Sequence, residues 1–150
     1  MINSTPQMAK TDLSISYEVR PKKDPLTQEI IGEMFFPLVM ISIKYGHRYS
    51  RPFLALVDSG SDRNLLPADI GESIGISFKK SKFITIGGIG SAQVKAFPKQ
   101  VKLKIDSNEY TVSADFCFEQ RIALLGRDGF FNLFQSVTFN EKTHYLDIKI

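Results

Sequence analysis

The chain has 150 residues, of which 43% are hydrophobic and 23% charged, and its formal net charge is +3. This length and composition predict one globular domain with its own hydrophobic core, and they exclude a disordered chain or a pair of large domains. The weak charge gives no support for a nucleic-acid partner, the lack of a long apolar run argues against a membrane protein, and the single cysteine, Cys117, excludes an internal disulfide and fits the cytoplasm.

Most of the chain carries apolar residues at every second position, the pattern of β-strands with one buried face. From the N-terminus, such strands are predicted at residues 13–19, 39–45, 101–105, 110–118 and 146–150. Two shorter apolar runs, residues 53–57 and 122–125, predict strands buried on both faces. Many short strands separated by turns indicate an all-β fold, either a barrel or a sandwich.

Helical signals are confined to two short segments. Pro67 is suited to the start of a helix over residues 68–74, which Gly75 would end. A second short helix is predicted over residues 128–134.

The N-terminal part of the chain differs from the rest. The first ten residues have no periodicity, and residues 20–28 form a polar connection marked by two prolines. We therefore expect a loosely ordered segment over residues 1–30, followed by a single domain over residues 31–150.

The first candidate site is the end of the apolar run, where residues 58–62 read Asp-Ser-Gly-Ser-Asp. An ionised carboxylate at the end of a buried strand is costly unless it is compensated, and Gly60 lets backbone N–H groups approach Asp58 closely. The alternative is an ordinary turn, for which Asp, Ser and Gly are common residues.

A second candidate is a glycine-rich turn between two strand-like segments, made of Gly87, Gly88, Ile89 and Gly90. Glycines at this density let the backbone approach a ligand closely, although a plain flexible hairpin would look the same. A phosphate-binding loop is excluded because a strand, and not a helix, is predicted after the glycines.

A third candidate follows the apolar run at residues 122–125, where Gly126 precedes Arg127 and Asp128. An arginine at the end of a buried strand calls for a carboxylate partner, and Asp62 is the candidate. The alternative is a surface arginine at a helix start.

Other chemistry has little support in the sequence. Two histidines, His47 and His144, are too few to predict a metal site, and Cys117 between two phenylalanines suits a packed thiol better than a nucleophile. No Gly-x-Ser-x-Gly motif is present, so a serine hydrolase is not indicated.

Taken in order, three motifs resemble those of the retropepsin-like aspartic proteases of cellular, prokaryotic type. They are residues 55–61 (Ala-Leu-Val-Asp-Ser-Gly-Ser), 86–91 (Ile-Gly-Gly-Ile-Gly-Ser) and 124–128 (Leu-Leu-Gly-Arg-Asp). The resemblance extends from about residue 36 to residue 139. It implies a closed acid-protease barrel with one or two short helices.

The resemblance also implies roles for the residues that match. Asp58 corresponds to the catalytic aspartate, in an active-site loop with Ser59, Gly60 and Ser61. Ser59 would join the hydroxyl network between two such loops, a role more often filled by threonine in this family. Gly60 would lie close to the substrate backbone.

The two other motifs take supporting roles in the resemblance. The glycine-rich turn corresponds to the flap that closes over a bound peptide. Gly126 and Asp128 would support the active-site loop from behind, while Asp62 and Arg127 would form a structural ion pair.

The implied reaction is peptide-bond hydrolysis by a water molecule that two aspartates activate, without metal or cofactor. Only one Asp-Ser-Gly motif is present, so the resemblance implies a homodimer with Asp58 from each protomer. The expected partners are a peptide or protein substrate and a second copy of the chain, with no nucleic acid and no membrane. Two alternatives stay open: a catalytically silent module for dimerisation or peptide binding, and a zymogen whose first thirty residues cover the cleft.

Substrate preference would depend on the apolar residues that line the cleft. Five residues are candidates for this lining, with plain core packing as the alternative for each: Phe53, Ile84, Ile89, Ile122 and Leu124.

Overall fold

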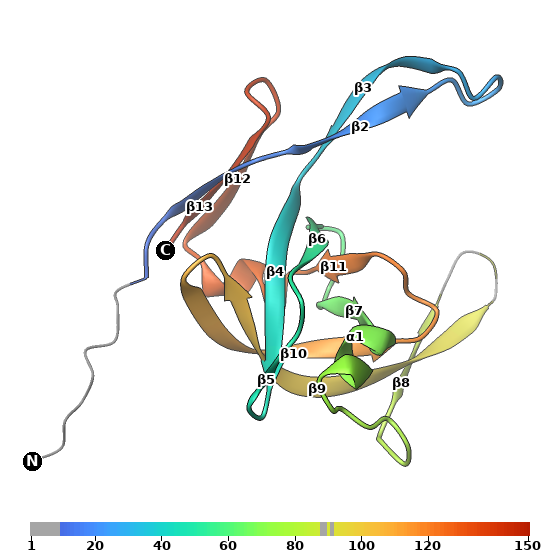
Figure 1. Cartoon of the computed structure of the whole chain (residues 1–150), viewed down its shortest axis with the longest axis vertical. Coiled ribbons are helices and arrows are strands. Elements are labelled where there is room, and N and C mark those ends of the chain that lie inside the picture. The colour runs from blue at the N-terminus through green and yellow to red at the C-terminus, as the bar shows by residue number, and fades with distance from the viewer. Residues whose placement is uncertain (1–9, 88–89, 91) are drawn as a thin grey trace, which may run out of the picture.

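Figure 1 shows the computed structural model of the chain, which describes residues 10–87, 90 and 92–150. Strands dominate it, with one short α-helix and a 3₁₀ turn at Phe131–Leu133. The elements in chain order are β1 (Leu13–Ser16), β2 (Glu18–Lys23), β3 (Ile30–Phe36), β4 (Leu38–Tyr45), β5 (Arg48–Tyr49), β6 (Phe53–Val57), β7 (Leu65–Pro67), α1 (Ala68–Ser73), β8 (Ile84–Gly87), β9 (Gln93–Ile105), β10 (Asn108–Cys117), β11 (Ala123–Leu125), β12 (Ser136–Asn140) and β13 (Tyr145–Lys149).

The centre of the molecule is a closed barrel of six strands in the order β4-β6-β11-β7-β10-β9, closed by pairing of β9 with β4. The alternation seen in the sequence places one face of each strand inside, as with Val39, Ile41 and Ile43 of β4, which are fully buried. The prediction of an all-β closed barrel is therefore confirmed.

A parallel strand pair, β11 with β6, brings distant parts of the chain together at one end of the barrel. β11 runs parallel to β6, with Leu125 opposite Val57. Because both strands end at this level, the residues that follow them, Asp58 and Gly126, emerge side by side. Two of the three sequence motifs thus meet at the end of one strand pair.

The helical segments are shorter than the sequence suggests. α1 follows Pro67 as predicted and ends just before Gly75, which has a φ of +94°. The predicted helix at residues 128–134 is only a 3₁₀ turn, because Gly129 at a φ of +111° breaks the helical path at its start.

The ordered domain begins upstream of the predicted boundary at residue 31. β1 pairs with β13 and joins β12 in a three-stranded sheet, and β2 pairs with β3. Of the polar connection expected at residues 20–28, residues 20–23 belong to β2 and the rest forms the turn to β3. Asp24 holds this turn, since its carboxylate accepts hydrogen bonds from two backbone N–H groups. Residues 1–9 lie outside the described residues.

Candidate active site

Asp58 lies at the end of buried strand β6, in a tight turn that fixes both its backbone and its carboxylate. Its N–H donates to Leu125 O at 3.0 Å, and its own carbonyl accepts from Ser61 N at 3.1 Å. Oδ1 of the carboxylate accepts a hydrogen bond from Gly60 N at 2.9 Å. The side chain is half-buried, while Ser59 and Gly60 are exposed. The carboxylate is thus held at a defined place with access to solvent.

The turn rests on the backbone that follows β11. Ser61 O accepts a hydrogen bond from Arg127 N at 2.9 Å, and Asp62 O accepts one from Asp128 N at 2.9 Å. A Cβ on Gly126 would lie 2.6 Å from Ser61 O and closer still to Arg63 O. Only glycine lets the two segments approach this closely, and the role of Gly126 as support for an active-site loop stays a prediction.

Asn64 joins the two segments and was not identified from the sequence. Its side chain is fully buried, and Oδ1 accepts a hydrogen bond from Gly126 N at 3.0 Å. Nδ2 donates to Gly129 O at 2.9 Å and to Ser113 O at 3.3 Å. One amide therefore satisfies three backbone groups around the loop. A signal was present, since a polar residue that directly precedes the apolar pair Leu65 and Leu66 calls for buried partners.

The charge pairing of the loop differs from the predicted pair of Asp62 and Arg127. Both of those side chains are exposed, and among the described residues the ion pairs belong to Arg63. Its guanidinium donates two hydrogen bonds to the buried Asp115 carboxylate, at 2.7 and 2.9 Å, and lies 3.7 Å from Asp128. Asp115 is the stronger partner because it is buried on β10 and offers both oxygens to the planar guanidinium.

The bond to Asp115 also acts on the arginine itself. It raises the pKa of Arg63, against the effect of burial, so the guanidinium stays charged. The sequence signal for Asp115 was a carboxylate inside the otherwise apolar end of β10, a position that requires a cation.

The glycine-rich turn connects β8 with β9, which pair antiparallel with Gly87 opposite Gln93. Gly87 and Gly90 are exposed, and Gly90 has a φ of +80°, a conformation that favours glycine. Gly88 and Ile89 lie outside the described residues. The hairpin predicted from the sequence is present, and its action as a flap stays a prediction.

Comparison with known proteins gives the fold a name. No protein-family model matches the chain, and no curated protein sequence does. Among solved structures, a retropepsin-like aspartic protease from Rickettsia conorii covers 93% of this chain and 99% of its own, with a TM-score of 0.62 and 15% identity. The chain has the retropepsin-like fold. The EIAV protease, solved with the inhibitor HBY-793, also matches, with 22% identity, a TM-score of 0.49, and coverage of 61% of this chain and 82% of its own.

Four of the five candidates for the cleft lining are among the residues that the structure describes, and none of the four is fully buried. Ile84 and Ile122 are exposed, and Phe53 and Leu124 are half-buried. The fifth, Ile89, lies outside the described residues. The exposure of Ile84 and Ile122 makes them available to a ligand, whereas Phe53 packs against the core, as its alternative interpretation held.

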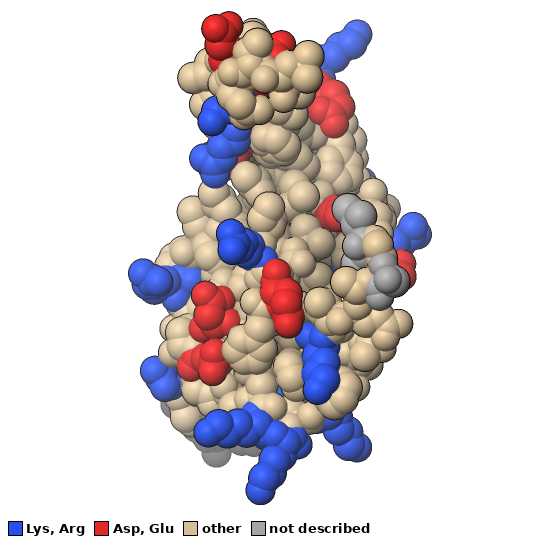
Figure 2. Space-filling view, turned by 90° about the vertical axis from the view of Figure 1, so that its right-hand side faces the viewer, with Lys and Arg blue, Asp and Glu red and all other residues tan. Residues whose placement is uncertain are grey.

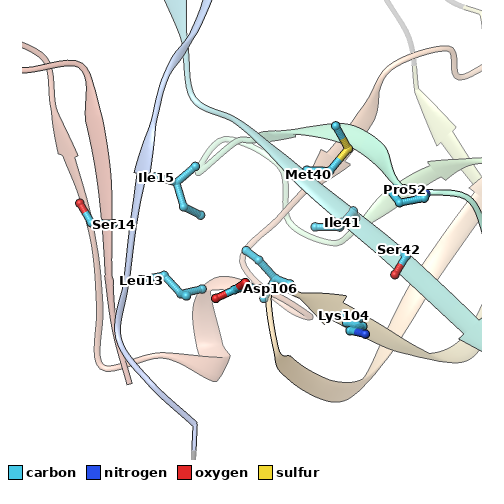
Figure 3. A pocket seen from close by; sticks show the side chains of 10 residues that line it. Leu13, Ser14, Ile15, Met40, Ile41, Ser42, Pro52, Lys104 and Asp106 are labelled. Carbon is cyan, nitrogen blue, oxygen red and sulfur yellow. The ribbon is translucent and has the colours of Figure 1, made fainter.

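A pocket of about 600 Å³ lies elsewhere on the retropepsin-like barrel, between β1 and β4 (Figure 3). Leu13 and Ile15 face Met40 and Ile41 across it, and Asp106 lies at one side. Its lining includes no described residue of the Asp58 loop, so we do not assign it to the candidate site. Within the described residues there is also no group of three or more His, Cys, Asp or Glu side chains that could hold a metal ion. No described helix is both long and apolar enough to cross a bilayer.

Proposed function

We propose that the protein is an aspartic endopeptidase that works as a homodimer, with Asp58 of each protomer in one shared site. The observation that carries this proposal is the Asp58 turn: a carboxylate held by Gly60 N at the end of a buried strand, on a retropepsin-like fold. An ordinary surface turn would not require Gly126 against it, nor the buried partners that fix Arg63 and Asn64 directly after it.

The chemistry requires two carboxylates at contact distance. Like charges this close cannot both ionise, so the pair holds one proton between them and titrates as a unit. The ionised member takes a proton from a water molecule, which attacks the scissile carbonyl carbon. The protonated member donates a hydrogen bond to the carbonyl oxygen, on which negative charge develops. The amide nitrogen of the tetrahedral intermediate then takes a proton from the pair, the carbon–nitrogen bond breaks, and the products are a carboxylic acid and an amine.

A second chain follows from the count of motifs. Asp-Ser-Gly occurs once in the sequence, and Asp62, the nearest other carboxylate along the chain, lies in the same loop four residues away. A two-fold axis through the turn would bring the two copies of Asp58 together and leave the bracing contacts of each protomer unchanged.

The expected substrate is a peptide in extended form. Such a peptide can add its backbone to strand edges on both sides of a cleft, and side-chain pockets then select its residues. The exposed Ile84 and Ile122 favour apolar side chains in those pockets.

The test is cleavage of a diverse peptide pool, read by mass spectrometry, with wild type, Asp58→Asn and Asp62→Asn. Asp62 is a matched control because it is an exposed carboxylate of the same loop that makes no ion pair with a described residue. We expect Asp58→Asn to lose at least a thousandfold in cleavage rate and Asp62→Asn to keep most of it. Cleavage that survives in Asp58→Asn would refute the proposal. A wild type that binds peptides without cleaving them would support the silent module instead.

A further inference from the structure

The β2–β3 ribbon, defined as Glu18–Lys23 and Ile30–Phe36, leaves the barrel as a two-stranded sheet of its own. It rises above the body of the molecule in Figure 1 and forms the upper lobe in Figure 2. Among the described strands, β2 and β3 pair only with each other. A two-stranded ribbon without a layer beneath it is only marginally stable in water. At its base, Phe35 packs against the core and stacks on His144, with the ring centroids 3.6 Å apart, and the rest of the ribbon is left for a partner to stabilise.

Apolar side chains of the ribbon are exposed to an extent that is unusual for strand residues. Val19 is 46% exposed, Ile31 55% and Met34 42%. Val19 lies opposite Phe35, whereas Met34 lies opposite Arg20 on the other face of the ribbon. Ile31 lies at the bulge where the pairing of the two strands shifts register. Apolar side chains left exposed together on one ribbon of a monomer mark an interaction surface.

The base of the ribbon lies next to the catalytic turn. Pro37, between β3 and β4, accepts a hydrogen bond from Val57 N at 3.0 Å, and Leu38 pairs with Leu56. Asp58 is the next residue after Val57. A second copy of this chain whose Asp58 lies beside the first will therefore also contact the ribbon.

The number of residues that a stable homodimer interface needs also favours contact between the ribbon and a second copy of the chain. A specific homodimer uses about 20–30 residues per protomer, and the Asp58 turn itself has only five, residues 58–62. The two strands of the ribbon contribute 6 and 7 residues. At about 3.4 Å per residue, β3 is roughly 20 Å long, which is enough to cross a two-fold axis at Asp58 and reach the other protomer.

The charges of the ribbon permit contact between identical copies. β2 carries Glu18 as well as three basic residues, Arg20, Lys22 and Lys23, and β3 carries Glu33. Because a two-fold axis places the same surface on both sides, a ribbon of a single sign would repel its copy. The presence of both signs on the ribbon reduces that repulsion.

We propose that the β2–β3 ribbon is a dimerisation arm whose exposed apolar side chains, among them Val19 and Ile31, pack against a second copy of this chain. The proposal rests on the proposed function, because it takes the shared Asp58 site as the position of the two-fold axis. The arm couples activity to assembly, since the residues that hold the dimer together begin one hydrogen bond away from the catalytic turn.

The test compares the double variant V19E/I31E with Met40→Glu, a matched control. Met40 is 53% exposed on β4, where it pairs with Leu54, and it belongs neither to the ribbon nor to residues 58–62. Sedimentation equilibrium of the full chain should show a dimer dissociation constant at least about tenfold larger for V19E/I31E, and little change for Met40→Glu. Replacement of residues 21–33 by Asn-Gly, which removes most of the arm, should weaken the dimer further. Circular dichroism checks that each variant keeps its strands.

A photo-crosslinking residue at position 31 locates the arm directly. We expect a covalent dimer on irradiation, and no dimer when the same residue stands at position 40. A wild-type dimer that cleaves peptides, resists all ribbon variants and gives no crosslink from position 31 would refute the arm and leave the proposed function standing. A monomeric wild type would refute the arm together with the shared site, whether or not it cleaves.

Discussion

Replacement of Asn64 by alanine should destabilise the protein far more than its small size suggests. The Asn64 amide is buried and bonded to three backbone groups: Gly126 N, Gly129 O and Ser113 O. Alanine removes all three bonds and leaves Gly126 N–H without a partner in the protein. Since Gly126 supports the turn that holds Asp58, we expect a loss of catalytic activity as well as of stability.

The size of the effect follows from these contacts. Each hydrogen bond contributes about 1 kcal/mol net, and a buried N–H without a partner costs about 1–3 kcal/mol more. The expected loss in the free energy of unfolding is therefore about 4–6 kcal/mol, out of roughly 5–15 kcal/mol for a domain of this kind. For about 150 residues this corresponds to a fall in Tm of roughly 10–20 °C.

The assay is urea unfolding followed by circular dichroism, with Asn132→Ala as the matched control. Asn132 belongs to the same loop region, but its side chain is exposed and accepts one hydrogen bond from Gly129 N, at 2.9 Å. Asn132→Ala should lower the free energy of unfolding by less than about 1 kcal/mol. Equal losses for the two variants would show that the buried amide does not hold the turn, and the reasoning would fail.

Two further predictions concern Gly126 and Cys117. Gly126→Ala forces a Cβ against Ser61 O and Arg63 O and should lower the free energy of unfolding by about 2–4 kcal/mol. The control is Gly87→Ala, whose Cβ would meet no atom of the described residues within 4 Å. Equal losses for the two variants would argue against the clash. Burial raises the pKa of Cys117 above its ordinary 9.0, so its thiol should react with Ellman's reagent at pH 8 only after unfolding in urea, and fast labelling of the native protein would contradict its burial. Because the native state holds that proton more tightly, this contribution to stability is complete below pH 9 and is lost as the pH rises beyond it.

Strand alternation predicted an all-β fold because it is a local signal, and it gives the buried face of β4 directly. The choice of a closed barrel over a sandwich came from the resemblance, as did the roles of Asp58 and Gly126. An apolar run such as β6 that ends in Asp58 is also a local signal. The parallel pairing of β11 with β6, which brings Gly126 beside the Asp58 turn, is seen only in the structure.

The partners of buried polar groups could not be predicted in the same way. Arg63 and Asp115 are 52 residues apart, and Asn64 and Gly126 are 62 residues apart. The observed ion pair, Arg63 with Asp115, replaces the predicted pair of Asp62 and Arg127 because Asp115 is the carboxylate buried beside the loop. The register of β10 with β7 decides this position. The N-terminal strands were underestimated for a related reason: β1 is stabilised by β13 at the other end of the chain.

The contacts of the Asp58 turn bear on how the proposed dimer would be activated. The N–H, carbonyl and carboxylate of Asp58 each have a partner within the same protomer, and Asn64 fixes the segment behind it. The turn is therefore ordered by folding of one chain, and association does not have to order it again. The free energy of ribbon contacts can then be used to bring together the two Asp58 carboxylates, each already held in place within its own protomer. On this reasoning, ribbon variants should lower activity at low protein concentration and recover it at high concentration, whereas Asn64→Ala should lower it at both.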